Sequence, residues 1–222
     1  MSSSEPLAPA CPRCRLQHQC LCDQIPALNS QLSFALLTHP NEVKRSTNSG
    51  QLIADVLPNN QVHLHIWQRK EPPEELIKQL KSDAYLPVLL YPNENSQTPE
   101  QIKVKLEIKK QSTASSSPKL LFIILDATWQ EAKKILNKSS WLDDVCHLKL
   151  EPTAASSYAL RRNQKQGHLC TCEVGIELLK QFDEPENAAK LDKYMQAYFA
   201  HFEADRSGHA LKPSVDKKLE IR

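Results

Sequence analysis

Short apolar runs alternate with longer amphipathic stretches along most of the chain. An apolar run of four to eight residues bounded by turn-forming residues is typical of a strand, whereas apolar positions three and four apart are typical of a helix. By these patterns, strands are expected at residues 32–37, 61–67, 88–91, 120–125 and 145–150. Helices are expected at residues 46–57, 73–80, 128–138, 170–182 and 187–202.

This alternation predicts an α/β fold, in which a parallel sheet carries helices on both faces. Residues 120–125 are apolar throughout, as expected for a central strand covered on both sides. Ligands of such folds gather beyond the carboxyl ends of the strands. The polar stretch 93–118 interrupts the rhythm. We interpret it as a surface insertion that could carry a hairpin, since apolar residues alternate with polar ones from Ile102 to Ile108.

The size and composition of the chain favour one main domain. Its 222 residues are 40% hydrophobic and 24% charged, which suffices for a globular domain with a small appendage. We expect a cysteine-containing knuckle at residues 1–30, the main domain at 31–205 and a flexible tail at 206–222. The net charge of +2 permits a nucleic-acid partner but does not require one. Because neither a secretory signal nor an apolar stretch of roughly 20 residues is found, we expect a cytoplasmic protein without a membrane partner.

Four of the seven cysteines lie close together near the N-terminus, at Cys11, Cys14, Cys20 and Cys22. This C-x2-C-x5-C-x-C spacing allows four thiolates to converge on one Zn²⁺ in a tetrahedral site, and a site closed by four sulfur ligands is structural. The alternatives are two local disulfides, which a reducing compartment disfavours, or four unrelated thiols. We therefore predict a zinc knuckle, in which His18 could substitute as a ligand, although a surface role for His18 is favoured.

The strand predicted at residues 120–125 runs directly into Asp126-Ala-Thr128-Trp129. Thr128 and Glu131 have the spacing of a capping box, in which each side chain satisfies a free backbone amide at a helix start. Capping accounts for neither Asp126 nor Trp129. A strand-end carboxylate can accept or orient a ligand proton, and an indole can stack on a ring, although Trp129 could also belong to the core.

These residues resemble the signature of the DTW-domain family, which is named for Asp-x-Thr-Trp. Further matching segments are the cysteine knuckle, His-Pro-Asn-Glu-Val-Lys-Arg-Ser-Thr-Asn-Ser-Gly at 39–50, Leu90-Tyr91-Pro92, and Ser-Tyr-Ala-Leu-Arg-Arg at 157–162. Together they cover nearly the whole chain in the correct order. The resemblance implies a knotted α/β fold similar to that of the SPOUT methyltransferases, and the activity of a tRNA-uridine aminocarboxypropyltransferase.

The implied reaction uses S-adenosylmethionine as the donor substrate. Its sulfonium activates all three attached carbons, so the enzyme's geometry decides which group is transferred. This family would present the 3-amino-3-carboxypropyl group to N3 of a uridine in tRNA and release methylthioadenosine. Uridine N3 carries a proton, so Asp126 is the catalytic candidate, either as a general base or as an orienting acceptor, and binding of the donor's ammonium is a third role open to it.

Residues around the predicted strand ends are the candidates for binding the donor. Arg45 and Thr47 follow the first strand and could meet the donor's carboxylate or an RNA phosphate, while a helix-capping loop is the plainer alternative. The densest internal basic run contains Arg161, Arg162 and Lys165, which we expect to contact tRNA unless it is a solvated loop. The full set of donor-binding candidates is Tyr91, Pro92, Leu125, Thr128, Trp129, Tyr158, Arg45 and Thr47.

Two departures from the family pattern concern the rim of the site. Cys170-Thr171-Cys172-Glu173 stands where the family usually has Ser-Thr-x-Glu, and the insertion at 93–118 is longer than usual. Two rival functions also fit the sequence: an RNA methyltransferase that uses the same donor, and a non-catalytic zinc-knuckle RNA-binding protein. The sequence leaves the oligomeric state open.

Overall fold

The computed structural model describes residues 9–112, 117–151 and 169–207. The chain divides into two compact units, which we describe separately. The larger unit comprises residues 26–192, and the smaller one joins residues 1–25 to residues 193–222. In the described part of the chain, no helix combines the length and the apolar character needed to cross a membrane.

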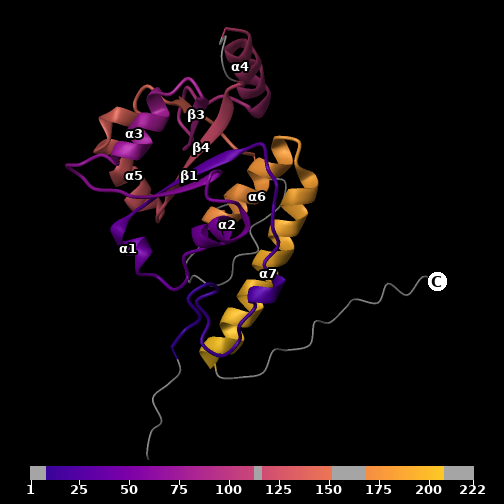
Figure 1. The fold of residues 1–222 in the computed structure, drawn as a ribbon. Coiled ribbons are helices and arrows are strands. Elements are labelled where there is room, and N and C mark those ends of the chain that lie inside the picture. Colours follow the sequence, from indigo (N-terminus) through magenta and orange to yellow (C-terminus); the bar gives the residue numbers. More distant parts are fainter. Residues whose placement is uncertain (1–8, 113–116, 152–168, 208–222) are drawn as a thin grey trace, which may run out of the picture. The chain divides into compact units, whose positions relative to one another are not determined.

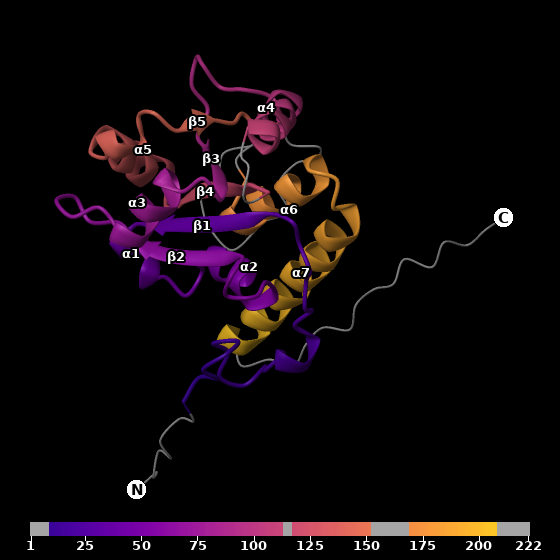
Figure 2. The same cartoon turned by 45° about the horizontal axis from the view of Figure 1, so that its top comes forward.

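The larger unit is built on a five-stranded parallel sheet with the order β2-β1-β4-β3-β5 (Figure 2). The predicted α/β class with a parallel sheet is therefore confirmed. The knotted SPOUT-type topology stays a prediction, because residues 152–168 lie outside the described residues. The strands are β1 (Ser33–Thr38), β2 (Val62–Ile66), β3 (Tyr85–Leu90), β4 (Lys119–Asp126) and β5 (Cys146–His147).

Helices cover both faces of this sheet (Figure 1). On one face, Leu76 of α3 and Ile135 of α5 pack with Leu37 and Ile123 of the central strands in a fully buried cluster. On the other face, Phe122 packs edge-on against Phe182, with ring centroids 4.8 Å apart. The helices are α1 (Pro40–Val43), α2 (Gly50–Val56), α3 (Glu74–Lys81), α4 (Pro99–Ser112), α5 (Trp129–Asn137), α6 (Thr171–Gln181) and α7 (Pro185–Ser207), with 3₁₀ turns at Cys22–Gln24 and Ser140–Leu142.

Most expected elements are present, but their ends differ. The helix expected at 46–57 begins only at Gly50, and the short helix α1 before it was not expected. The strand expected at 145–150 pairs regularly only at Cys146–His147. Asp126 is the last residue of β4 instead of following it. Arg206 and Ser207, expected in the tail, still belong to α7, while residues 208–222 lie outside the described residues.

The hairpin expected within residues 93–118 is wrong, since this segment forms the fourteen-residue helix α4. The apolar residues that alternate in this segment lie on a helix and differ in how far they are exposed. Ile102 is fully buried and anchors the helix, whereas Val104 and Ile108 are 59% and 60% exposed. One anchoring residue on a largely exposed helix leaves no clear helical periodicity in the sequence.

Candidate active site at the sheet's carboxyl edge

Asp126 ends the central strand β4 and is buried, with only 2% of its surface exposed. Its Oδ2 accepts hydrogen bonds from the Thr38 hydroxyl at 3.1 Å and the Asn48 amide at 2.8 Å. Its Oδ1 accepts one from the Thr171 hydroxyl at 2.7 Å. Thr38 lies directly opposite Asp126 in the β1–β4 register, so the parallel pairing itself brings this donor to the carboxylate.

Gly50, the first residue of α2, packs directly against this carboxylate. A Cβ atom added at Gly50 would lie 3.0 Å from both Cγ and Oδ1 of Asp126 and 3.1 Å from Oδ2. These distances are shorter than ordinary van der Waals contacts, so only glycine allows the helix start to approach this closely. The start of α2 therefore closes one side of the carboxylate's pocket.

Burial raises the pKa of Asp126, and the hydrogen bonds from Thr171, Asn48 and Thr38 oppose that shift. Thr38 and Asn48 both donate to Oδ2 and use its two acceptor positions, whereas Oδ1 accepts one hydrogen bond, from Thr171. Thr171 is partly exposed whereas Asp126 is buried, so the Thr171 hydroxyl is the more accessible group of this hydrogen-bonded Thr171–Asp126 pair. The arrangement can accept a proton or hold a polar group through this pair.

The loops after β1 and β4 meet at Glu131. The predicted capping box is present: Thr128 accepts from the Glu131 amide, while Glu131 Oε2 accepts from the Thr128 amide at 2.9 Å and its hydroxyl at 2.7 Å. Glu131 Oε1 also accepts a hydrogen bond from the side-chain amide of Asn41 at 3.1 Å. Arg45 donates to both carboxylate oxygens of Glu131, each at 3.2 Å. Glu131 thus does more than cap α5, because it connects two separate loops beside Asp126.

Arg45 also donates to Glu42, whose side chain is almost wholly buried. Arg45 is therefore shared between two carboxylates. Burial would raise the pKa of Glu131, but the hydrogen bonds from Thr128, Asn41 and Arg45 outweigh it and lower the pKa to about 2. The carboxylates of Asp126, Glu42 and Glu131 thus all interact with the one guanidinium of Arg45.

Two aromatic side chains lie at the same edge of the sheet. Trp129, the first residue of α5, is 47% exposed, although large aromatic side chains are usually well buried. Its ring centroid lies 5.9 Å from that of Tyr91, which follows β3, and the two planes are tilted by 53°. An exposed indole beside a phenol ring can accommodate a planar ligand by stacking.

The first turn of α6 brings the third donor, Thr171, to Asp126. Cys170 caps this helix in a capping box with Glu173, and the Cys170 amide donates to Glu173 at 2.8 Å. Ser49 accepts from the Cys172 amide at 3.3 Å, which connects the starts of α2 and α6. Burial and the neighbouring Glu173 carboxylate raise the pKa of Cys170 to about 12, which favours the neutral thiol at neutral pH.

The structure brings some of the predicted site residues together and leaves others undescribed. Asp126, Thr128, Trp129, Tyr91 and Arg45 all lie at the carboxyl edge of the sheet, as expected of strand-end residues. Leu125 is buried in the core next to Asp126, Pro92 is exposed after Tyr91, and Thr47 is half-buried. Tyr158, Arg161, Arg162 and Lys165 lie outside the described residues.

Sequence reasoning missed that Thr38, Thr171 and Gly50 surround the carboxylate and that Glu131 joins two loops. For Gly50 and Thr171 a signal existed, because both fall within segments that match the family pattern. Thr38 could have been found from the expected pairing of two parallel strands that end together. The second role of Glu131 leaves no sequence signal beyond its capping spacing.

The four N-terminal cysteines converge in the smaller unit, and all four thiols are free. Their sulfur atoms lie within 4.8 Å of one another, with Cys11 and Cys22 separated by 3.4 Å and Cys14 and Cys20 by 3.6 Å. A tetrahedron with Zn–S bonds of about 2.3 Å has sulfur atoms about 3.8 Å apart, so this cluster is compatible with zinc.

The loop between Cys14 and Cys20 is held by the last turns of α7. The carboxylate of Asp205 accepts backbone hydrogen bonds from Gln17 at 3.0 Å, Gln19 at 2.8 Å and also His18. A ring nitrogen of His201 makes a further bond to the Gln19 carbonyl at 2.9 Å. The knuckle is thus fixed by a helix that follows it by about 180 residues.

These features define an α/β protein with a candidate site at the carboxyl ends of a parallel sheet and a four-cysteine knuckle. A model of the DTW domain family matches residues 8–203. The chain belongs to the DTW domain family.

The curated relatives are distant, since each is less than 30% identical to this chain. It is 27% identical over 176 residues to tRNA-uridine aminocarboxypropyltransferase 2 of Macaca fascicularis and 28% identical over 176 residues to the protein of that name from Mus musculus. Each comparison covers 77% of this chain and 55% of the relative. The Drosophila melanogaster protein of that name is 26% identical over 177 residues, which is 72% of this chain and 61% of the relative. The chain thus spans little more than half the length of these relatives, and no solved structure matches it.

Proposed function

We propose that this chain acts in the cytoplasm as a tRNA-uridine aminocarboxypropyltransferase. It would transfer the 3-amino-3-carboxypropyl group of S-adenosylmethionine to N3 of a uridine and release methylthioadenosine. The observation that carries the proposal is the buried Asp126, held by three donors at the carboxyl edge of the sheet in a chain of the DTW domain family. The relatives named for this activity support it.

In this proposal, Asp126 and Thr171 handle the proton of uridine N3. Because Asp126 is 2% exposed, its carboxylate reaches the base most directly through the hydroxyl of Thr171, which already donates to Oδ1. That hydroxyl oxygen can accept the N3 proton while it passes its own proton to the carboxylate. A pKa raised by burial makes Asp126 a better base than an exposed aspartate.

The electrostatics of the site suit a cationic donor. Asp126, Glu42 and Glu131 place three carboxylates against one guanidinium, that of Arg45. An excess of negative charge in a partly buried site favours the positive sulfonium and ammonium groups of S-adenosylmethionine. Arg45 is 34% exposed and keeps the buried carboxylates compensated, and its outer edge can meet the donor's carboxylate.

The remaining donor and RNA contacts rest on the resemblance together with position. Trp129 and Tyr91 would stack on a ring of the donor or on the target base. Pro92, Leu125, Thr128, Thr47 and Tyr158 would frame the donor, largely through backbone groups. Arg161, Arg162 and Lys165 would contact tRNA phosphates.

We propose further that Cys11, Cys14, Cys20 and Cys22 hold one structural Zn²⁺. Four thiolates at these separations fill the coordination of the metal, which leaves no position for a substrate. The metal would supply folding free energy to a loop that has few apolar residues of its own.

The decisive experiment incubates the purified protein with S-adenosylmethionine and bulk tRNA and separates the coproducts by chromatography. Methylthioadenosine is expected, whereas adenosylhomocysteine would identify a methyltransferase. The absence of either product with every tRNA tested would favour a non-catalytic RNA-binding protein. Asp126→Asn and Thr171→Val should each suppress turnover while the zinc content stays at the wild-type level. Unchanged turnover in Asp126→Asn would remove Asp126 from the catalytic residues.

A further inference from the structure

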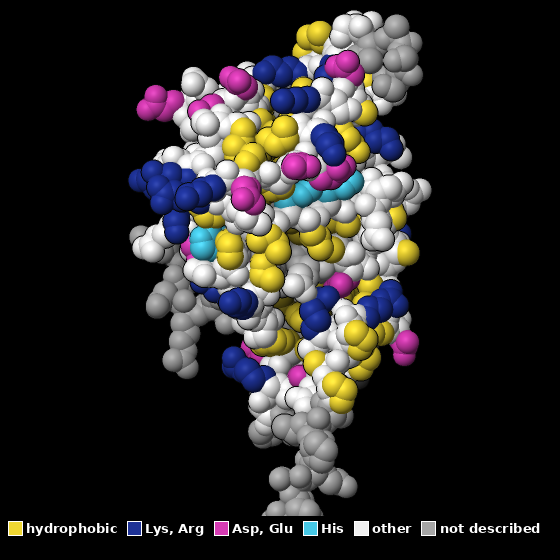
Figure 3. Space-filling view, turned by 60° about the vertical axis from the view of Figure 1, so that its left-hand side comes forward, with side chains coloured by type: hydrophobic (Ala, Val, Ile, Leu, Met, Phe, Trp, Pro, Cys, Tyr) yellow, Lys and Arg dark blue, Asp and Glu magenta, His cyan; other side chains and the backbone are white. Residues whose placement is uncertain are grey.

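Five exposed basic residues lie in the segments that follow the carboxyl ends of the neighbouring strands β1, β2 and β4, and we name them the β2 rim. We propose that the β2 rim binds the phosphates of the RNA substrate, an inference that rests on the proposed function. In Figure 3, Lys and Arg side chains form a dense group at the left edge of the view and are scattered over the rest of that surface. The members of the β2 rim are Lys44, Arg69, Lys70, Lys133 and Lys134.

The β2 rim lies close to the candidate active site. Trp67, the first residue after β2, donates from its backbone amide to the Thr38 carbonyl at 2.9 Å, and the Thr38 hydroxyl contacts Asp126. The ammonium of Lys134 lies 6.0 Å from the centroid of the Trp67 ring. Adjacent strands are about 4.8 Å apart, so Trp67 at the end of β2 is roughly 10 Å across the sheet from Asp126 on β4.

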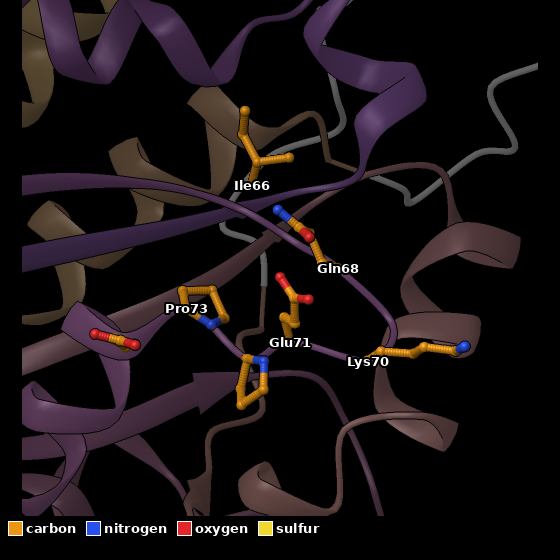
Figure 4. A pocket seen from close by; sticks show the side chains of 7 residues that line it. Ile66, Gln68, Lys70, Glu71 and Pro73 are labelled. Atoms are coloured by element: carbon orange, nitrogen blue, oxygen red, sulfur yellow. The ribbon is translucent and has the colours of Figure 1, made fainter.

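The loop after Trp67 carries two further cations toward solvent. Arg69 and Lys70 are both exposed, and this loop borders a shallow depression of about 450 Å³. In Figure 4 the Lys70 side chain extends away from Glu71 and Pro73 on the same loop. The depression is lined by Ile66, Gln68, Lys70, Glu71, Pro72, Pro73 and Glu74.

The cations of the β2 rim are not neutralised by ion pairs in the part of the chain that the structure describes. Within residues 9–112, 117–151 and 169–207, no ion pair involves any of the five. Three of the lysines of α4 differ, since Lys103, Lys109 and Lys110 each pair with a carboxylate. Three exposed acids follow Lys70 in the sequence, Glu71 in the loop and Glu74 and Glu75 in the first turn of α3, so they are fewer than the five cations.

An RNA backbone is the partner that this surface fits. Its phosphates present a row of negative charges, and exposed lysine and arginine side chains bind them by releasing counterions. A uridine that enters the site next to Asp126 would bring its flanking phosphates toward the basic side chains beside Trp67, which itself lies roughly 10 Å across the sheet. The β2 rim would therefore position tRNA without reading its sequence.

The test measures tRNA binding by the zinc-loaded full chain at several salt concentrations. Lys133→Gln/Lys134→Gln and Arg69→Gln/Lys70→Gln should each weaken binding by about 5- to 8-fold per lost phosphate contact at 0.1 M salt, and should lower the slope of log K against log salt by about 0.7 to 0.9 per contact. At saturating tRNA, both variants should release methylthioadenosine at the wild-type rate. A higher KM for tRNA with an unchanged kcat would distinguish a lost RNA contact from a catalytic defect.

A matched control is Lys81→Gln/Lys119→Gln. Lys81 ends α3 and Lys119 begins β4, so both are exposed cations at the opposite, amino edge of the sheet. This control should bind tRNA as the wild type does. The inference is overturned if both rim variants keep the wild-type affinity and salt slope, or if the control weakens binding as much as they do. Release of methylthioadenosine by the wild type is measured separately, so the proposed function can fail or stand independently of the β2 rim.

Discussion

Replacing Glu131 by glutamine should destabilise the larger unit in a way that depends on pH. In the native protein the pKa of Glu131 is lowered to about 2 from an ordinary value of 4.5, because hydrogen bonds from Thr128, Asn41 and Arg45 outweigh the effect of burial. A depressed carboxyl pKa contributes stability that is fully present above the unfolded-state pKa and is lost as pH falls toward the folded-state pKa.

The size of this contribution follows from the shift. A difference of about 2.5 pKa units corresponds to about 3 kcal/mol at neutral pH, at 1.36 kcal/mol per unit. By linkage, about 1.4 kcal/mol of it should be gone at pH 3.5. The glutamine in Glu131→Gln carries no charge. Its NH2 group is itself a donor and would face the donors of Thr128 or Arg45, so at least one of these hydrogen bonds would be lost.

Unfolding by urea, followed through tryptophan fluorescence, is the appropriate measurement. All three tryptophans, Trp67, Trp129 and Trp141, lie in the larger unit, so the signal reports on the unit that contains Glu131. The free energy of unfolding of the wild type should exceed that of the variant by about 3 kcal/mol at pH 7 and by roughly half that at pH 3.5. A gap of the same size at both pH values would refute an ionic role for Glu131, and no gap at pH 7 would refute its role as a connector.

Three further changes test other parts of the structure. Gly50→Ala places a Cβ about 3.0 Å from the Asp126 carboxylate, so it should cost about 1–3 kcal/mol in urea unfolding and reduce methylthioadenosine release, whereas an unaffected variant would show that the helix start can shift freely. Cys20→Ser should lower the zinc content measured by elemental analysis from one ion per chain, and wild-type content would remove Cys20 from the ligand set. Asp205→Asn weakens the acceptor of three backbone amides in the knuckle loop, so zinc should pass to a chelator faster than in the wild type; equal rates would contradict this role of α7.

The parallel sheet could be predicted from the sequence because its central strands are apolar and separated by clear turns. Residues 120–125 are buried on both faces, so they form an apolar run without alternation. The position of Asp126 at the edge of the sheet followed from that strand. Helix α4 could not be predicted, since only Ile102 anchors it and its exposed Val104 and Ile108 imitate a strand pattern.

The candidate site was predictable in its motif but not in its connections. Asp126, Thr128 and Trp129 are adjacent in sequence, so their grouping at one strand end required no knowledge of the fold. The donors to Asp126 come from residues 88, 78 and 45 positions away, and tertiary contacts of this kind leave no local pattern. Arg45 was expected to meet an anionic ligand, and only the structure shows that Glu42 and Glu131 already share its charge.

The sequence separation of the groups around Asp126 has a consequence for biosynthesis. Thr38 and Asn48 leave the ribosome long before Asp126, and Thr171 follows only after a further 45 residues. Contacts across such separations form late, because loops must close before any contact compensates their entropy. A nascent chain that ends before α6 therefore carries a strand-end carboxylate without its third donor, and the site is completed only when translation of this domain is nearly finished.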